Sequence, residues 1–186
     1  MSCATFQKQR LRSISAALLI AAIAWRCSGE DAAPAKPKVD FGKLKDQAQA
    51  MADGLRKGDY EKLADHTYPK LIELMGGRET MLAEVKKTMA AMKQEGFEIL
   101  SYVVDTPTEV LGTPPDLAAI LPQKMRIRLK NGVISQAAFL LAVSGDSGAT
   151  WTFVDGAQLT PEIVKQILPK SLHGIKLPEV PPPAPE

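Results

Sequence analysis

Cysteine and aromatic residues are scarce in this chain of 186 residues, and neither sign of charge is in clear excess. The two cysteines, Cys3 and Cys27, lie near the N-terminus, so the chain from Ser28 onward can form no internal disulfide bond and has no thiolate nucleophile. The 23 Lys and Arg against 21 Asp and Glu give a net charge of only +2, which implies no strong electrostatic partner. With 45% hydrophobic residues, the composition favours one compact globular domain over a disordered chain or a multi-span membrane protein.

Long hydrophobic runs are also lacking, apart from a short one near the N-terminus. Three basic residues, Lys8, Arg10 and Arg12, precede the run Ile14–Trp25, which is twelve residues long and interrupted only by Ser15. As a helix this run would be about 18 Å long, whereas the hydrocarbon core of a bilayer is about 30 Å thick. We therefore interpret residues 1–27 as a signal peptide, with a buried N-terminal helix as the alternative, and expect an exported bacterial protein (periplasmic, envelope-associated or extracellular).

The end of the signal peptide has two interpretations. Small residues at Ala22 and Ala24 suit cleavage after Ala24, while Cys27 suggests a lipoprotein. Arg26 stands directly before Cys27, where a lipoprotein signal requires a small residue. If Cys27 is lipidated, it would anchor the protein to a membrane through its acyl chains, which would be its one membrane contact.

The small positive charge belongs to this first segment. Residues 1–35 contain four of the 23 basic side chains and two of the 21 acidic ones, which leaves 19 of each sign in the rest of the chain. Binding to nucleic acid needs Lys and Arg clustered along the phosphate backbone. We therefore expect no nucleic-acid partner.

The remaining chain divides by composition into a flexible linker at 28–40, a domain at 41–170 and a proline-rich tail at 171–186, disordered by default or a docking ligand for a partner. Apolar spacing predicts a helix from Phe41 that ends at Gly58, a short helix capped by Asp59, and an amphipathic helix between Arg78 and Gly96. The methionines of this last helix indicate either core or an adaptable binding groove.

Beyond Gly96 the hydrophobic period changes to two. It predicts strands at 97–105, 124–130, 133–144 and 150–155, of which the last three form consecutive antiparallel neighbours. Asn131-Gly132 predicts the hairpin between the two central strands, and Thr160-Pro161-Glu162 the start of a short final helix. One strand has a basic face, formed by Lys124, Arg126, Arg128 and Lys130. We interpret this face as exposed to solvent, with contact to an acidic partner as the alternative. The fold class is thus α+β, with N-terminal helices packed on a curved antiparallel sheet.

Two short motifs carry a resemblance to a known superfamily. They are KGDYEKLA at 57–64, where a Gly-Asp-aromatic step joins two helices, and TWTFVDG at 150–156 in the last strand. With these motifs, residues 41–158 resemble the NTF2-like superfamily of cone-shaped domains, including SnoaL-like proteins, and the chain is similar to secreted bacterial proteins of that kind with a proline-rich end. The resemblance implies a pocket between sheet and helices, with the last strand as one wall. The superfamily contains enzymes, carriers and protein-binding modules, so the fold alone fixes no activity.

Four residues are candidates for the polar lining of such a pocket: His66, Tyr68, Trp151 and Asp155. His66 beside Tyr68 suits a general base, although a histidine at a helix end also caps the helix or faces solvent. Asp155 precedes Gly156, where a carboxylate commonly accepts hydrogen bonds from turn amides.

Two further kinds of site have little support in the sequence. His66 and His173 lack the short spacing of metal ligands, so we expect no metal and no cofactor. The Gly76-Gly77-Arg78 step has the composition of an anion-binding turn and, more simply, of a helix break.

These observations lead to one hypothesis and two alternatives. The hypothesis is an exported noncatalytic domain that binds a small molecule or a protein partner, with a homodimer through the outer face of its sheet. The first alternative is an isomerase or dehydratase that uses His66 and Asp155 as acid and base. The second is an envelope lipoprotein tethered at Cys27.

Overall fold

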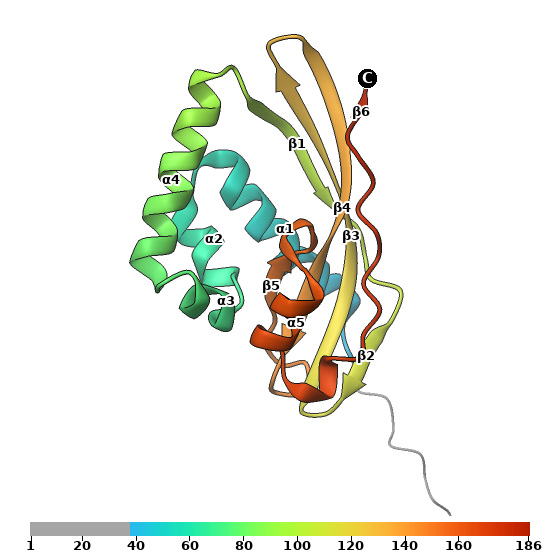
Figure 1. Ribbon diagram of the computed structural model, residues 1–186. Helices are drawn as coiled ribbons and strands as arrows, with labels where there is room; N and C mark the ends of the chain where they lie inside the picture. The colour runs from blue at the N-terminus through green and yellow to red at the C-terminus, as the bar shows by residue number, and fades with distance from the viewer. Residues whose placement is uncertain (1–37) are drawn as a thin grey trace, which may run out of the picture. The chain divides into compact units, whose positions relative to one another are not determined.

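The computed structural model describes residues 38–186, which form four helices followed by an antiparallel sheet and a further short helix (Figure 1). This order confirms the α+β class and the packing of N-terminal helices on a curved antiparallel sheet. The expected signal peptide at 1–27, the lipidation site Cys27 and residues 28–37 of the expected linker lie outside the described residues.

Local sequence explains where the first helices begin and end. Asp40 accepts a hydrogen bond from the Lys43 amide at 3.1 Å and starts α1 (Phe41–Lys57), which ends at Gly58 in the left-handed conformation (φ 77°). Asp59 caps α2 (Tyr60–His66) in the same way, through the Lys62 amide at 3.2 Å. The expected Gly-Asp step between the two helices is confirmed. Two more helices follow, α3 (Pro69–Leu74) and α4 (Arg78–Gln94).

The sheet has six strands in the order β1-β3-β4-β5, with β2 paired to β3 and β6 paired to β4. All of these pairings are antiparallel. The strands are β1 (Glu98–Val104), β2 (Val110–Thr113), β3 (Asp116–Leu129), β4 (Gly132–Ser144), β5 (Thr152–Asp155) and β6 (Ala184–Pro185). The predicted run of three antiparallel neighbours, β3 to β5, and the hairpin at Asn131-Gly132 are confirmed.

The first half of β3 and all of β2 were not predicted, because prolines obscure the strand pattern there. Pro122 lies inside β3 and has no backbone N–H to donate. No neighbouring strand is left without a hydrogen bond, because none pairs with Pro122 on that side. On its open side β3 pairs with β2 up to Ala119 and with β1 from Gln123, so Pro122 falls in the gap between the two partners. Its carbonyl accepts from the Asp105 amide at 2.8 Å on that side, which is where its missing N–H would also point.

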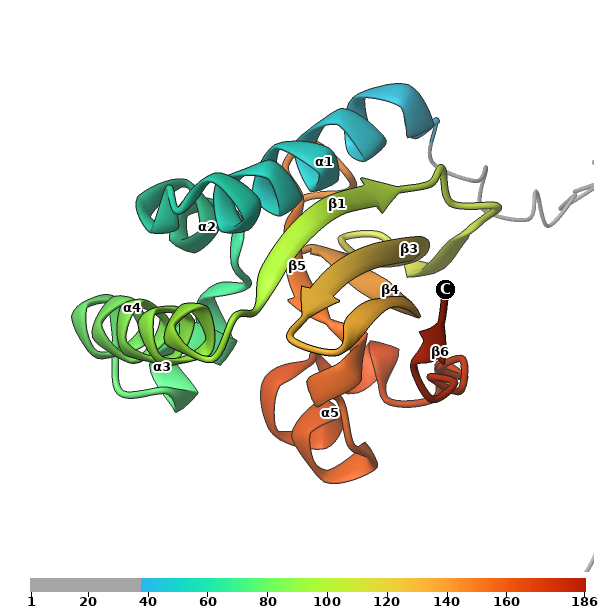
Figure 2. The same ribbon diagram turned by 90° about the horizontal axis from the view of Figure 1, so that it is seen from above.

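Both faces of the sheet are covered, as Figure 2 shows with α1 and α5 (Pro161–Ile167) on opposite sides. The face toward α1 carries one hydrophobic cluster, which includes Leu44, Met51, Tyr102, Leu140 and Phe153. The face toward α5 carries another, which includes Phe139, Leu141, Val154, Val164 and Leu172. Burial on both faces explains the continuous apolar centre of β4.

The proline-rich tail is ordered against the sheet, so the expectation of a disordered end is wrong. β6 pairs with Ile134 and Ser135 of β4, and the Gln136 side-chain amide donates to the Pro181 carbonyl at 2.9 Å. Arg126 of the basic strand face makes an ion pair with Glu186 at 2.6 Å. The tail occupies the β4 edge that the short β5 leaves unpaired, and an open edge would be a site for unwanted strand pairing.

Helix α4 differs from the expected core helix. It packs on α2 and α3, and only Met81 and Leu82 are buried. Val85, Met89 and Met92 of its apolar stripe are half-exposed. Among residues 38–186, no helix is long and apolar enough to cross a membrane.

Candidate functional site

A cavity of about 300 Å³ lies between the four N-terminal helices and the sheet face formed by β1 and β5. This volume is at the lower end of the range of small-molecule pockets. Most of the lining is apolar and comes from methionine, leucine, valine and phenylalanine side chains; its polar members are Thr67, Glu84, Thr88, Tyr102, Asp155 and Gln158. The apolar stripe of α4 forms one wall of the cavity through Met81, Val85 and Met89, of which Met81 is also part of a buried cluster.

Three polar side chains are linked across the sheet side of this cavity. The Tyr102 hydroxyl donates to Gln123 Oε1 at 2.5 Å, and Gln123 Nε2 donates to Asp155 Oδ1 at 3.4 Å. Asp155 Oδ1 also accepts from the Ala157 amide at 3.0 Å and so begins the short 3-10 turn Gly156–Gln158. Within the described residues, Asp155 Oδ2 accepts no hydrogen bond, which leaves this oxygen for a ligand.

Burial controls the ionisation of this network. It raises the pKa of Asp155, and the hydrogen bonds from the Ala157 amide and from Gln123 oppose the rise. Burial also raises the pKa of Tyr102, with a further contribution from the charge of Asp155. Tyr102 is therefore a neutral donor, and a hydrogen-bond donor brought in by a bound molecule would favour the charged form of Asp155, which burial disfavours.

Of the four residues predicted for the pocket, Asp155 lines the cavity and the other three do not. Asp155 combines the two roles considered for it, since one oxygen satisfies a turn amide and the carboxylate also faces the cavity. Trp151 is buried in the core, where its indole N–H donates to the Gly148 carbonyl at 3.1 Å and holds the turn before β5.

His66 and Tyr68 flank Thr67, which forms a bridge with Phe153 of β5, and neither of them lines the cavity. The His66 ring meets the Phe153 ring edge-on, with 6.4 Å between their centroids, and burial lowers its pKa with help from Lys62. The Tyr68 side chain packs in the α5-side cluster, and its amide donates to the Phe153 carbonyl at 2.9 Å. The structure therefore does not bring His66 into the cavity that Asp155 faces.

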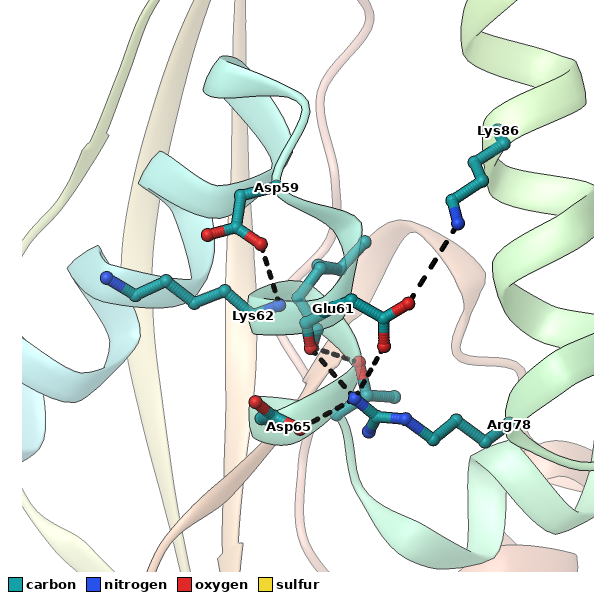
Figure 3. Close-up of polar contacts among 8 residues, drawn as sticks. Asp59, Glu61, Lys62, Asp65, Arg78 and Lys86 are labelled. Carbon is teal, nitrogen blue, oxygen red and sulfur yellow. Dashed lines mark hydrogen bonds and ion pairs between the residues drawn. The ribbon is translucent and has the colours of Figure 1, made fainter.

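Charged side chains fasten the α4 wall to α2, as Figure 3 shows. The Arg78 guanidinium contacts Glu61 at 2.9 Å and Asp65 at 2.7 Å, and Lys86 lies 3.9 Å from Glu61. The Gly76-Gly77-Arg78 step is thus a helix break whose arginine turns to α2. These pairs are exposed, so each contributes little to stability; they link α4 to α2, against which Met81 and Leu82 pack.

Sequence reasoning missed Tyr102 and Gln123. Each stands on the inward face of a strand among apolar neighbours, and a polar residue at such a position was the available signal. In the described part of the chain, no group of three or more His, Cys, Asp and Glu side chains is placed to hold a metal ion.

No family model, curated protein or solved structure matches this chain.

Proposed function

We propose that this domain binds a small, largely apolar molecule in the cavity between α1–α4 and the sheet, and that Asp155 accepts a hydrogen bond from it. The observation that carries the proposal is that Asp155, whose Oδ2 accepts no hydrogen bond within the described residues, lines a cavity formed mainly by hydrophobic side chains. An apolar pocket with a few fixed polar groups is the usual form of a small-molecule site. The neutral Tyr102 and Gln123 hold the carboxylate in place.

The domain is further proposed to be an NTF2-like cone that is exported from a bacterial cell. Support for the cone comes from the Gly-Asp step between α1 and α2, the curved antiparallel sheet, and a cavity with β5 as one wall. Support for export comes from the signal-like residues 1–27. The lipoprotein alternative depends on acylation of Cys27. Ligand binding in the cavity does not report on that modification, so it needs a separate test.

Binding is preferred over the isomerase or dehydratase alternative because of the position of His66. A dyad of His66 with Asp155 requires both side chains in one cavity within hydrogen-bond reach of a substrate, and His66 does not line it. For the alternative that the domain binds a protein partner, the surface of the described residues offers no comparable observation.

The proposal is tested with the neutral apolar fluorophore N-phenylnaphthylamine, titrated into the full chain. The variant Val85→Lys places an ammonium group in the cavity lining, and we expect it to weaken fluorophore binding by about tenfold or more. The matched control is Ala83→Lys, which adds the same side chain on the exposed side of α4. Equal affinity in both variants, or no binding to the unmodified chain, would overturn the proposal.

Native mass spectrometry of the chain produced in a bacterial host tests the processing and the cargo together. A mature chain that starts at Trp25 with a retained small molecule supports an exported carrier. An acylated Cys27 supports the tethered form instead. An N-terminus at Met1 contradicts export.

A further inference from the structure

A second cavity, of about 520 Å³, adjoins the main one at the C-terminal end of α4. Leu55 and Met89 line both cavities, so the two meet at these side chains. The second cavity is otherwise formed by the end of α1, the end of α4 and the start of β1. Together the cavities follow α4 from Met81 to Lys93, a distance of about 18 Å at the helical rise of about 1.5 Å per residue.

The two cavities differ in polarity, and the second one is positively charged. Three cations line it: Arg56, Lys57 and Lys93. Glu98, the acidic residue of the lining, is paired with Arg128 at 2.6 Å and so does not neutralise them.

One carboxylate is shared between two of these cations. Asp53 lies 3.2 Å from Lys57 and 3.9 Å from Arg56. Lys93 makes no ion pair with any residue in the described range. A positive charge therefore remains beside Met89, at the junction with the apolar cavity.

We propose that the two cavities form one site for a single-chain anionic amphiphile. Its hydrocarbon chain would lie in the main cavity, where a hydroxyl group on the chain would donate a hydrogen bond to Asp155, and its carboxylate would lie between Arg56 and Lys93. A volume of about 300 Å³ suits one chain rather than two, because it is at the lower limit of ligand pockets. This inference rests on the proposed function and adds the class of ligand to it.

Three ligands of equal chain length separate the effect of charge from that of the hydrocarbon. Laurate, lauryl alcohol and laurylamine are used to displace N-phenylnaphthylamine from the full chain, below the concentrations at which they form micelles. Laurate is expected to bind at least about tenfold more tightly than laurylamine, with an affinity that falls as salt is added. Lauryl alcohol is expected to bind between the two and to be insensitive to salt.

A charge reversal at Lys93 locates the headgroup. Lys93→Glu is expected to weaken laurate by about tenfold and to leave lauryl alcohol within about twofold. The matched control is Lys87→Glu, which makes the same charge change on an exposed position of α4 outside both cavities. Equal losses in the two variants would overturn the location of the headgroup.

The outcomes separate this inference from the function on which it rests. If the fluorophore and lauryl alcohol bind but laurate binds no better than laurylamine, the anionic class is wrong and the apolar site stands. If neither the fluorophore nor any of the three ligands binds, the proposed function itself is wrong.

Discussion

The Tyr102 hydroxyl donates a hydrogen bond to Gln123 Oε1 at 2.5 Å, and each residue is only 4% exposed. Tyr102 stands on β1 and Gln123 on β3, so the bond joins two strands beneath the cavity. Buried polar groups of this kind cost stability unless each has a partner. The Tyr102 bond therefore holds the Gln123 side chain in the position from which its Nε2 donates to Asp155 Oδ1.

Tyr102→Phe removes the donor and leaves Gln123 Oε1 buried without a partner. We expect the free energy of unfolding to fall by about 1–2 kcal/mol, measured by urea denaturation. Tyr60→Phe is the matched control, because Tyr60 is half-buried and its hydroxyl makes no hydrogen bond within the described residues. Its change is expected to stay within about 0.5 kcal/mol. Equal losses in both variants would show that the Tyr102 hydroxyl bond contributes nothing specific.

Asp155→Asn is expected to make the folded protein more stable near neutral pH. Burial raises the pKa of Asp155 above its ordinary value of 3.8, so the folded protein holds the proton more tightly than the unfolded chain. The stability that this group contributes is complete below that ordinary value and is lost as the pH rises through the folded-state pKa. Asparagine keeps the Oδ1 acceptor and removes the charge.

The check is a series of urea midpoints from about pH 3 to about pH 7. The variant should exceed the unmodified protein at the upper end, and the two should converge at the lower end. Asp105→Asn, on the exposed loop after β1, is the control for a general charge effect. A variant less stable than the unmodified chain at neutral pH would show that its neighbours favour the Asp155 charge.

Where local residues dictate local structure, the sequence was sufficient to predict helix ends and turns. Gly58 and Asp59 mark the α1–α2 step, and Asn131-Gly132 marks the central hairpin, because left-handed and capping conformations admit few residue types. The start of β3 could not be predicted in this way. Pro122 is tolerated only because two different strands meet opposite it, and that is a fact of tertiary structure.

The candidate site depended even more on tertiary packing. Asp155, at the end of a strand, was predicted to line the pocket and does so, whereas His66 and Tyr68, at the end of a short helix, were predicted to line it and do not. His66 and Tyr68 flank Thr67, which pairs with Phe153 of β5, and hydrophobic periodicity does not reveal such a tertiary pairing. The separation of α4 from the sheet, which creates the cavity, was likewise absent from the hydrophobic pattern.

Asp146 stabilises the turn between β4 and β5, and its loss should lower the melting temperature. Its carboxylate accepts hydrogen bonds from the Thr150 hydroxyl at 2.6 Å, the Thr150 amide at 2.9 Å and the Ser144 hydroxyl at 2.7 Å. These bonds lower the pKa of Asp146 to about 2. Its contribution is therefore present above the ordinary value of 3.8 and is lost as the pH falls through about 2.

We expect Asp146→Asn to melt at a lower temperature than the unmodified chain at neutral pH, with the difference shrinking in acid. An amide offers one acceptor oxygen where the turn uses two. Asp105→Asn again serves as the exposed control and should melt like the unmodified chain. The role assigned to Asp146 would be contradicted by a difference that stays constant across the acid range.

Gly156 follows Asp155 directly and is required by the close approach of the Phe139 ring. A Cβ at this position would lie 2.5–2.6 Å from three atoms of that ring, which is closer than atoms can pack. Gly156→Ala is therefore expected to cost about 1–3 kcal/mol of unfolding free energy, because the buried ring must shift.

The double variant Gly156→Ala with Phe139→Leu should be more stable than the sum of the two single losses predicts, since the smaller side chain makes room for the methyl group. Strict additivity in urea denaturation would show that the loss comes from the backbone instead of the Phe139 contact. Gly145→Ala, where an added Cβ meets no atom within 4 Å, should leave the stability nearly unchanged.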